Sequence, residues 1–162
     1  MTSFLAYVIT VSDRSAAGER EDRGGPLAVR LLDEAGIASA GSEIVPDGAD
    51  SVEEAIRRAI ATGARLVVTT GGTGVGPRDR TPEGTERVLT RAVPGIAEEL
   101  RRVGVADTPL SVLSRGVAGV VEPEGALVVN LPGSTGAVAS GIPVIVSVAA
   151  HVIDQMKGGD HS

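Results

Sequence analysis

The sequence predicts an α/β fold, a three-layer α/β/α domain with a mostly parallel sheet between two layers of helices. Short apolar runs rich in β-branched residues alternate along the chain with segments whose apolar residues recur at helical spacing. The chain has 162 residues, a length typical of one domain, and we find no repeat, linker or low-complexity segment in it. We therefore expect one continuous domain over residues 1–162.

In the first half of the chain we expect three strands and two helices in alternation. The apolar, β-branched run from Phe4 to Ser12 is typical of a buried strand. Leu27, Leu31 and Leu32 share one helical face, and Gly36 ends that helix. The expected elements are a strand over 4–12, a helix over 26–35, a short strand over 43–45, a helix from residue 51, and a strand over 66–70.

The helix that begins at Ser51 has the clearest periodic pattern. Ser51 and Glu54 have the spacing of a capping box, in which the serine side chain accepts a hydrogen bond from the backbone of the first turn. Apolar residues then follow the i, i+3, i+4, i+7, i+8 pattern at every position. They are Val52, Ala55, Ile56, Ala59 and Ile60.

In the second half, two helices come first. Thr81 and Pro82 are expected to be the N-cap and first residue of a helix that runs to about Arg91. The next helix, over 95–103, is expected to carry an i, i+4 ion pair between Glu98 and Arg102.

The last elements are two strands and a helix. The strands are expected over 117–121 and 126–131, joined by a tight turn over 122–125. The final helix is expected to have Pro143 near its first turn and to end around Met156.

The composition argues against several kinds of site. The chain has no cysteine, which excludes a disulfide, a thiolate zinc site, an iron–sulfur cluster and a cysteine nucleophile. The net charge is −6, which argues against general electrostatic binding of nucleic acid. Because Phe4 and Tyr7 are the only aromatic residues, a stacking platform for single-stranded bases is not expected either.

We expect a cytoplasmic protein that contacts no membrane. The absence of cysteine fits a reducing compartment, and the first residues lack the basic segment of a signal peptide. The uncharged stretch over residues 125–153 is long enough to span a membrane, but Asn, Pro and Gly residues interrupt it. It is therefore expected to form a strand, a loop and a buried helix.

Four short polar segments each follow a predicted strand. They are Ser12-Asp13-Arg14, Val45-Pro46-Asp47-Gly48, the segment over residues 69–74, and Leu131-Pro132-Gly133-Ser134. Because ligands of such folds bind at the carboxyl ends of parallel strands, these segments are expected to meet at one edge of the sheet.

The segment TTGGTGVGPRD, residues 69–79, is the densest signal for a binding site. Glycines after a buried strand let backbone N–H groups approach an anion closely, and threonine hydroxyls add donors. The candidate residues are Thr70, Gly71, Gly72, Thr73 and Gly74. The segment lacks the Lys-Ser/Thr of a P-loop and the glycine spacing of a dinucleotide fingerprint. The alternative is a tight turn that binds nothing.

Asp47 and Asp79 are the candidate catalytic and metal-binding acids. Each lies in a loop after a strand, beside glycine or proline rather than on a charged helix face. Mg²⁺ is commonly held by one or two carboxylates together with substrate phosphates. The pair therefore favours metal-assisted phosphoryl or nucleotidyl transfer. The alternative is two solvated turn aspartates.

Arginines beside these segments are candidate anion receptors. Arg14, Arg78 and Arg115 each lie in or next to a loop motif, where a guanidinium could hold phosphate or carboxylate. The alternative for each is solvation or an ion pair. The polar segment over 15–25 is long for a connection between a strand and a helix, which indicates a binding loop. By contrast, Arg20, Arg57 and Arg101 are expected to be solvated.

Six motifs along the chain resemble one protein family. VSDR, IVPDG, TTGGTGVGPRDRTPE, PGI, LSRGVAGV and NLPGS occur in the order found in molybdopterin adenylyltransferases. These are the bacterial Mog and MoaB proteins, which are related to the N-terminal domain of gephyrin. The resemblance extends from Tyr7 to about Met156, and TTGGTG followed by PRD and TPE is its most specific part.

The resemblance implies an enzyme of molybdenum cofactor synthesis that adenylylates molybdopterin with ATP and Mg²⁺ and releases pyrophosphate. It implies that Asp47 and Asp79 are the two essential acids near the metal and the reacting phosphates. It also implies a homotrimer, or a hexamer, and a molybdenum insertase as a further partner. The pocket residues that it implies are Ser12, Asp13, Arg14, Thr70 to Gly74, Ser114, Arg115, Pro132, Gly133 and Ser134.

The sequence departs from the family pattern in two places. After Gly133 it continues Ser134-Thr135-Gly136, without the usual Pro and Lys, which puts the phosphate contact of that loop in doubt. After TPE it has Gly84 where Ala is usual, which is expected only to weaken the start of a helix, by up to ~1 kcal/mol.

Three other functions are weighed against the enzyme. A paralogue of the same fold could bind molybdopterin without adenylylating it, although both acids are present here. A molybdenum insertase shares the fold, but insertases carry further domains and a different glycine loop. An oligomeric scaffold with no small ligand is the third alternative.

Overall fold

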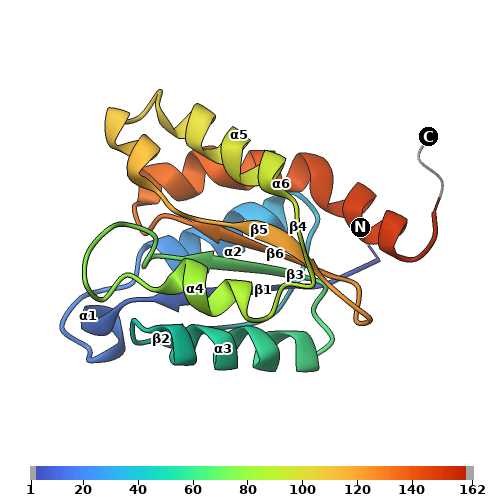
Figure 1. The fold of residues 1–162 in the computed structure, drawn as a ribbon, viewed down its shortest axis with the longest axis horizontal. Coiled ribbons are helices and arrows are strands. Elements are labelled where there is room, and N and C mark those ends of the chain that lie inside the picture. Colours follow the sequence, from blue (N-terminus) through green and yellow to red (C-terminus); the bar gives the residue numbers. More distant parts are fainter. Residues whose placement is uncertain (1–2, 160–162) are drawn as a thin grey trace.

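The computed structural model describes residues 3–159, in which six strands form one sheet in the order β2-β1-β3-β6-β5-β4 (Figure 1). The strands are β1 (Ala6–Val11), β2 (Ser39–Val45), β3 (Leu66–Thr70), β4 (Arg91–Ala92), β5 (Ala118–Val121) and β6 (Ala126–Leu131). β1, β2, β3 and β6 pair in parallel, while β5 is antiparallel to both of its neighbours. The expected mostly parallel sheet is confirmed.

Helices cover both faces of this sheet. They are α1 (Asp13–Ala16), α2 (Gly24–Glu34), α3 (Ala49–Ala61), α4 (Thr81–Glu86), α5 (Pro94–Gly104), the 3₁₀ helix η1 (Pro109–Leu113) and α6 (Thr135–Met156). α2, α5 and α6 pack on one face, and α3 and α4 pack on the other (Figure 1). The expected three layers are confirmed.

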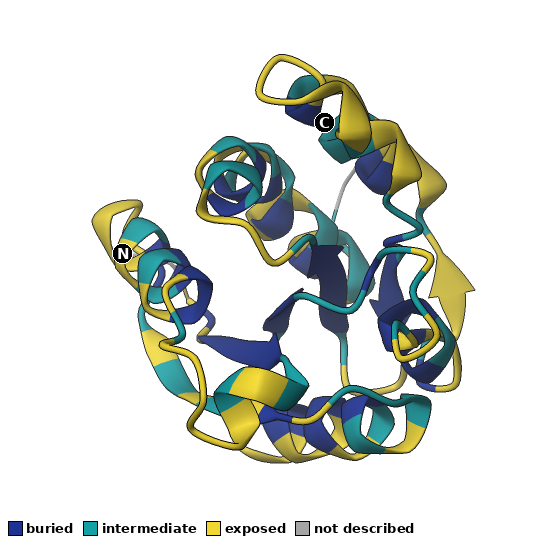
Figure 2. Ribbon diagram, turned by 90° about the vertical axis from the view of Figure 1, so that its left-hand side faces the viewer, coloured by how far each residue is buried: buried dark blue, intermediate teal, exposed yellow. Residues whose placement is uncertain are grey.

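The alternation of side chains along the strands divides the core in two. On β1, Ala6 and Val8 face α2 and α6, whereas Tyr7 and Ile9 face α3. Successive side chains of a strand point to opposite faces, so a strand covered on both faces is mostly apolar. Figure 2 shows the result for β1, β3, β5 and β6, which are buried between helices that carry exposed residues on their outer sides. The apolar runs of the sequence therefore predicted the central strands well.

The apolar stripe of α3 is buried as expected, but the capping box is wrong. The helix begins two residues earlier, at Ala49, and Gly48 is its N-cap. The Ser51 hydroxyl donates to the carbonyl oxygens of Pro46 and Gly48, at 2.6 and 3.0 Å. Because Ser51 lies inside the first turn, its hydroxyl reaches the carbonyls of the preceding loop, and it does not accept from an N–H group of the helix.

The helix expected to run from Thr81 to about Arg91 is shorter. α4 ends at Glu86, and Arg91 begins the edge strand β4. The N–H groups of Thr90 and Val93 donate to carbonyl oxygens of β5, each at 2.9 Å, so pairing with the sheet replaces the last helical turns. The N-cap is Arg80, not Thr81.

Three further expectations on local structure are corrected. β2 begins at Ser39, four residues before the expected strand, because it pairs with the full length of β1. Arg102 pairs with Glu99, three residues before it, rather than with Glu98, four residues before it. Pro143 lies inside α6, because Ser134 caps the helix by accepting from the Ala137 N–H at 3.1 Å.

α6 is long and apolar enough to cross a membrane by length and composition. It nevertheless packs against α2 and α5 over the sheet. Its buried side chains are Val138, Ile142, Ile145, Ala149 and Ile153. The strand, loop and helix expected over residues 125–153 are confirmed as β6, the segment over 132–134, and α6.

Gly84 lies where α4 packs closely against α3, a role that was not expected from the sequence. A Cβ atom at this position would lie 2.5 Å from the carbonyl oxygen of Ala49 and 2.9 Å from the Cβ of Val52. Such distances are far below van der Waals contact, so only glycine lets α4 approach α3 this closely.

Gly84→Ala is therefore expected to lower the free energy of unfolding by about 1–3 kcal/mol through overpacking, despite the better helix propensity of alanine. Gly95→Ala is the matched control, because Gly95 lies in the first turn of α5 and a Cβ there meets nothing within 4 Å. Urea denaturation of both variants measures the difference. Equal stability of the two variants would contradict the packing role.

Candidate functional site

The loops that follow four parallel strands meet at one edge of the sheet, as expected. The Ser12 N–H donates to the Val45 carbonyl oxygen, and the Gly71 N–H donates to the Leu131 carbonyl oxygen, each at 2.9 Å. The loops border a cavity of about 900 Å³. The expected site residues that line it are Ser12, Asp47, Thr70, Gly71, Gly72, Thr73, Gly74, Asp79, Ser114, Pro132, Gly133 and Ser134. Asp13, Arg14 and Arg115 do not line it.

The cavity lies at the carboxyl ends of β1 and β3, from which the chain continues toward opposite sides of the sheet. β2 and β3 flank β1 on opposite sides, and the chain after β1 passes through α1 and enters α2 on one face. The chain after β3 instead enters α4 on the other face. Such a switch point opens a crevice between the two diverging loops, which is where open α/β sheets bind their ligands.

Two glycines allow the loop after β3 to take its path. Gly71 has φ +94°, and a side chain there would collide with the Val11 carbonyl oxygen. Gly72 has φ +69°, and a Cβ there would collide with the Thr81 hydroxyl and approach Asp47 Oδ1 to 3.1 Å. The loop is a tight turn, and its backbone also lines the cavity. Glycine is required for its conformation and for the space around it.

A buried polar network holds this loop in place. The Thr81 hydroxyl donates to the Gly71 carbonyl oxygen at 2.8 Å, and the Thr85 hydroxyl donates to the Thr81 carbonyl oxygen at 2.8 Å. Asn130 then donates through Nδ2 to the hydroxyls of Thr85 and Thr69, at 3.0 and 2.9 Å. The sequence interpretation missed this role of Asn130, although an amide within an otherwise apolar strand was a usable signal.

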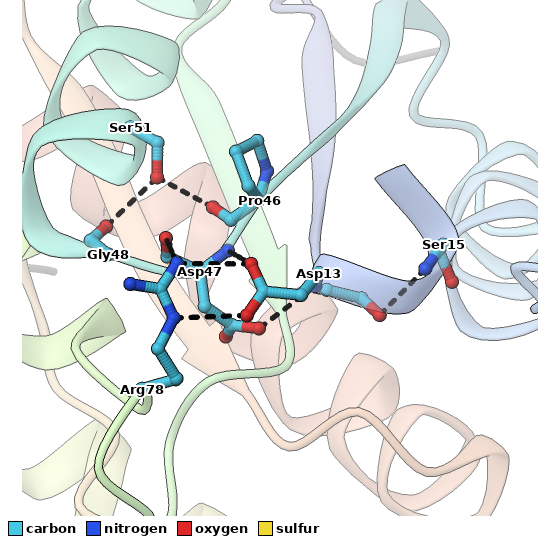
Figure 3. Close-up of polar contacts among 8 residues, drawn as sticks. Asp13, Ser15, Pro46, Asp47, Gly48, Ser51 and Arg78 are labelled. Carbon is cyan, nitrogen blue, oxygen red and sulfur yellow. Dashed lines mark hydrogen bonds and ion pairs between the residues drawn. The ribbon is translucent and has the colours of Figure 1, made fainter. Parts of the chain in front are cut away.

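Asp13, Asp47 and Arg78 tie together the loops after β1, β2 and β3 (Figure 3). The N–H group of each aspartate donates to the carboxylate of the other, both at 3.0 Å. Arg78 donates to the two Asp13 oxygens at 3.1 and 3.2 Å, and to the Asp47 carbonyl oxygen at 2.9 Å. The Arg78 guanidinium lowers the pKa of the Asp13 carboxyl. Asp13 and Arg78 therefore serve to place Asp47.

Asp47 and Asp79 lie close enough to interact electrostatically. Burial raises the pKa of the Asp47 carboxyl, and the nearby Asp13 and Asp79 carboxylates raise it further. The hydrogen bond from the Asp13 N–H and the charge of Arg78 oppose this shift. Asp79 accepts the Gly76 N–H on Oδ2 at 3.0 Å, so its loop folds around its own carboxylate. The cavity thus holds two carboxylates beside a glycine-rich turn.

Comparison with known proteins places the chain in a family. A family model described as a probable molybdopterin binding domain matches residues 7–151, which is most of the chain. The chain belongs to this molybdopterin-binding family. The suspected relation to the Mog and MoaB proteins is confirmed.

Relatives of known name agree with this assignment. A molybdopterin adenylyltransferase of Pyrococcus furiosus is 40% identical over 161 residues, which cover 96% of this chain and 92% of the relative. A molybdenum cofactor biosynthesis bifunctional protein of Synechococcus elongatus is 42% identical over 161 residues, or 99% of this chain. The chain spans about half the length of that bifunctional relative.

The solved structure of the molybdopterin biosynthesis Mog protein of Mycobacterium ulcerans shares the fold. It superposes with a TM-score of 0.87 at 42% sequence identity, and the match covers 95% of this chain and 99% of that one. The fold class expected from the sequence is therefore that of a Mog protein.

In this molybdopterin-binding domain, the arginines that line the cavity are not the ones expected from the sequence. Arg14 is exposed on α1 and does not line the cavity, and Arg78 and Arg115 are engaged with carboxylates. Arg20 and Arg23 line the cavity instead. Both belong to the long segment over 15–25, so the loop length was the informative signal.

Two arginines that were expected only to be solvated have other surroundings in the structure. Arg101 was expected to be solvated, but it donates to the carbonyl oxygens of Ser114 and Gly116, at 3.2 and 3.1 Å. Arg101 therefore helps to hold the segment that brings Ser114 to the cavity. Arg20 was also expected to be only solvated, and it is an exposed residue that borders the cavity.

Asp47→Asn is expected to raise the stability of this domain at neutral pH. The raised pKa of Asp47 means that its ionised form costs the folded state free energy at every pH above that pKa. Asparagine cannot ionise and its side-chain oxygen can still accept the Asp13 N–H, so the penalty is removed.

The gain in melting temperature is expected to shrink as the pH falls through the raised pKa, because the folded state then takes up the proton of Asp47 and no longer holds a half-buried charge. Thermal melts between pH 4 and 7 test this. Asp33→Asn, on the exposed surface of α2, controls for the change in net charge. A destabilised Asp47→Asn variant at neutral pH would contradict the expectation.

Proposed function

We propose that this domain is a molybdopterin adenylyltransferase, which transfers the adenylyl group of Mg-ATP to molybdopterin and releases pyrophosphate. The observation that carries the proposal is that Asp47 and Asp79 line one cavity beside the turn over Gly71–Gly74. The match to a molybdopterin-binding family supports molybdopterin as the acceptor of the adenylyl group. A relative named molybdopterin adenylyltransferase supports the adenylylation reaction.

The reaction joins two polyanions. The terminal phosphate of molybdopterin attacks the α-phosphorus of ATP, the bond to the β-phosphate oxygen breaks, and pyrophosphate leaves. No protein nucleophile is needed. The domain has to hold both substrates in line and to offset the repulsion between their phosphates. Backbone N–H groups of the glycine-rich turn and of the first turn of α6 are suited to this role because they carry partial positive charge.

The two carboxylates fit a magnesium ion held jointly with substrate. In residues 3–159, no group of three or more His, Cys, Asp or Glu side chains is arranged to hold a metal. Asp47 and Asp79 each accept one backbone N–H on Oδ2, and in the same residues neither Oδ1 accepts a hydrogen bond. Mg²⁺ bound by two such oxygens and by phosphates would supply charge neutralisation at the reacting phosphate.

We propose that Arg20 binds substrate phosphate. It is an exposed cation at the cavity of a protein whose net charge is −6. Among the described residues it has no hydrogen-bond or ion-pair partner. Arg20→Ala is expected to weaken Mg-ATP binding about threefold to tenfold, and to reduce the loss of affinity with rising salt.

Calorimetry at two ionic strengths measures both effects. Arg30→Ala is the matched control, because Arg30 is exposed on α2 and does not line the cavity. If the two variants respond alike, net charge and not a local contact determines binding.

Turnover of ATP with molybdopterin and Mg²⁺, followed by pyrophosphate release, tests the proposed reaction. Release that depends on molybdopterin supports the enzyme. Binding of molybdopterin without pyrophosphate release would instead favour the non-catalytic paralogue of the same fold. The presence of both acids in the cavity favours the enzyme.

The assembly and its surroundings are also proposals. We propose a homotrimer, with a hexamer as the alternative, in the cytoplasm, and delivery of the adenylylated product to a molybdenum insertase. Light scattering of the purified protein measures the oligomeric state. Addition of an insertase to the turnover assay tests whether the product is passed on.

A further inference from the structure

Arg115 lies beside the cavity but directs its side chain at the protein. Its Nε donates to the Gly74 carbonyl oxygen at 2.8 Å, and its Nη2 donates to the Asp79 carbonyl oxygen at 2.8 Å. Its Nη1 and Nη2 also donate to the two carboxylate oxygens of Glu83, at 2.7 and 3.2 Å. The guanidinium therefore makes four hydrogen bonds within the protein, although it has only five N–H groups.

These contacts leave Arg115 poorly suited to bind a phosphate. Its charge is neutralised by the Glu83 carboxylate in a two-pronged pair, the strongest geometry for this interaction. The guanidinium in turn lowers the pKa of the Glu83 carboxyl, so the pair is ionised at neutral pH. Arg115 is also absent from the lining of the cavity.

The same contacts define the two ends of the loop that carries Asp79. Gly74 and Asp79 are the first and last residues of a six-residue segment, and Arg115 holds both of their carbonyl oxygens. The backbone N–H of Arg115 donates to the Thr73 carbonyl oxygen at 2.8 Å, immediately before the loop. Within the segment, Val75 is 74% exposed, so apolar packing contributes little to its position.

Glu83 anchors this arrangement to a helix. It lies in the first turn of α4, whose neighbouring residues Thr81, Pro82 and Thr85 are buried. The ion pair thus connects a loop that has few packing contacts of its own to an element that is fixed in the core. An error in loop position of about 1 Å can cost two orders of magnitude in rate, which is why such loops need support.

We propose that Arg115 and Glu83 are positioning residues, which clamp the Gly74–Asp79 loop so that the Asp79 carboxylate faces the cavity. The proposal rests on the proposed function, in which Asp79 acts near the reacting phosphates. It assigns to Arg115 a role other than that of the phosphate receptor expected from the sequence.

Glu83→Gln separates the two roles of Arg115. If Arg115 bound a substrate phosphate, loss of the Glu83 charge would free the guanidinium and lower KM for ATP or molybdopterin. If the pair positions the loop, Glu83→Gln lowers kcat about threefold or more while each KM changes less than about twofold. Arg115→Lys is expected to lower kcat at least about tenfold, because an ammonium group cannot hold two carbonyl oxygens and a carboxylate in a planar fork.

A measurement without substrate reports on the loop itself. Hydrogen–deuterium exchange over residues 74–79 is expected to be at least about fivefold faster in Glu83→Gln and Arg115→Lys than in the unmodified protein. Glu99→Gln is the matched control, because it removes an exposed Glu–Arg pair from α5 without contact to this loop. That variant is expected to leave exchange in the loop unchanged.

Unchanged exchange in both loop variants, or a lower KM in Glu83→Gln, would overturn the positioning role. An unmodified protein without turnover would refute the proposed function instead. The exchange experiment would in that case still decide whether the pair holds the loop.

Discussion

Asp79→Asn is expected to lower kcat for adenylylation at least about tenfold, which corresponds to ~1.4 kcal/mol of activation free energy. The substitution keeps the size of the side chain. It also keeps an oxygen that can accept the Gly76 N–H, whose nitrogen lies 3.0 Å from Asp79 Oδ2 in the unmodified protein. It removes the negative charge with which Asp79 would bind a magnesium ion beside the reacting phosphates. Because Asp79 lies in a loop, the free energy of unfolding is expected to change little.

Pyrophosphate release under saturating Mg-ATP measures the effect, and Asp47→Asn should give a loss of similar size. Asp33→Asn makes the same change of charge on the exposed surface of α2 and should behave as the unmodified protein does. Near-normal rates in both the Asp47 and the Asp79 variant would refute their catalytic role. That result would favour a domain that only binds molybdopterin.

Gly72→Val is expected to abolish measurable binding of molybdopterin and ATP. Valine at φ +69° is strained, at a cost of about 1–2 kcal/mol or more, and its Cβ would collide with the Thr81 hydroxyl. It would also displace Asp47, whose Oδ1 lies 3.1 Å from the position of that Cβ. The turn and one of the two acids would therefore move together.

Calorimetric titration measures the loss of affinity, and a cooperative thermal melt checks that the variant is folded. Gly63→Val separates strain from position. Gly63 also has a positive φ, +99°, but it lies between α3 and β3, and a Cβ there meets nothing within 4 Å. The control should lose stability and keep its affinity. Unchanged affinity in Gly72→Val would mean that this segment is an ordinary turn.

The sequence predicted the layers of the fold because burial leaves a local pattern. β3, covered by helices on both faces, is buried at every position and is apolar up to Thr69 and Thr70 at its end, and α3 repeats its apolar residues at helical spacing. Element ends were predicted less well. At Ser51 and Arg91, contacts with the preceding loop and with β5 outweighed the local signals for a cap and for a longer helix.

The candidate site was predictable to the level of its segments. Glycines, aspartates and prolines directly after strands are visible in the chain, and parallel strands bring their carboxyl ends to one edge. The roles of single charged residues were not predictable in the same way. Arg20 lines the cavity although it was expected to be solvated, whereas Arg115 faces Glu83 rather than the cavity.

The sequence by itself therefore determined the order of the main strands and helices, but not α1, β4 or η1, and it located the glycine-rich turn and the two aspartates that line the cavity. These depend on residue types at short spacing. Only the tertiary structure decided which carboxylate each arginine meets, and which glycine leaves room for a neighbouring helix. Arg78 lies 65 positions from Asp13 along the chain, and Arg115 lies 32 from Glu83. A guanidinium can pair with any carboxylate that folding brings within reach, so the choice of partner is a property of the packed chain.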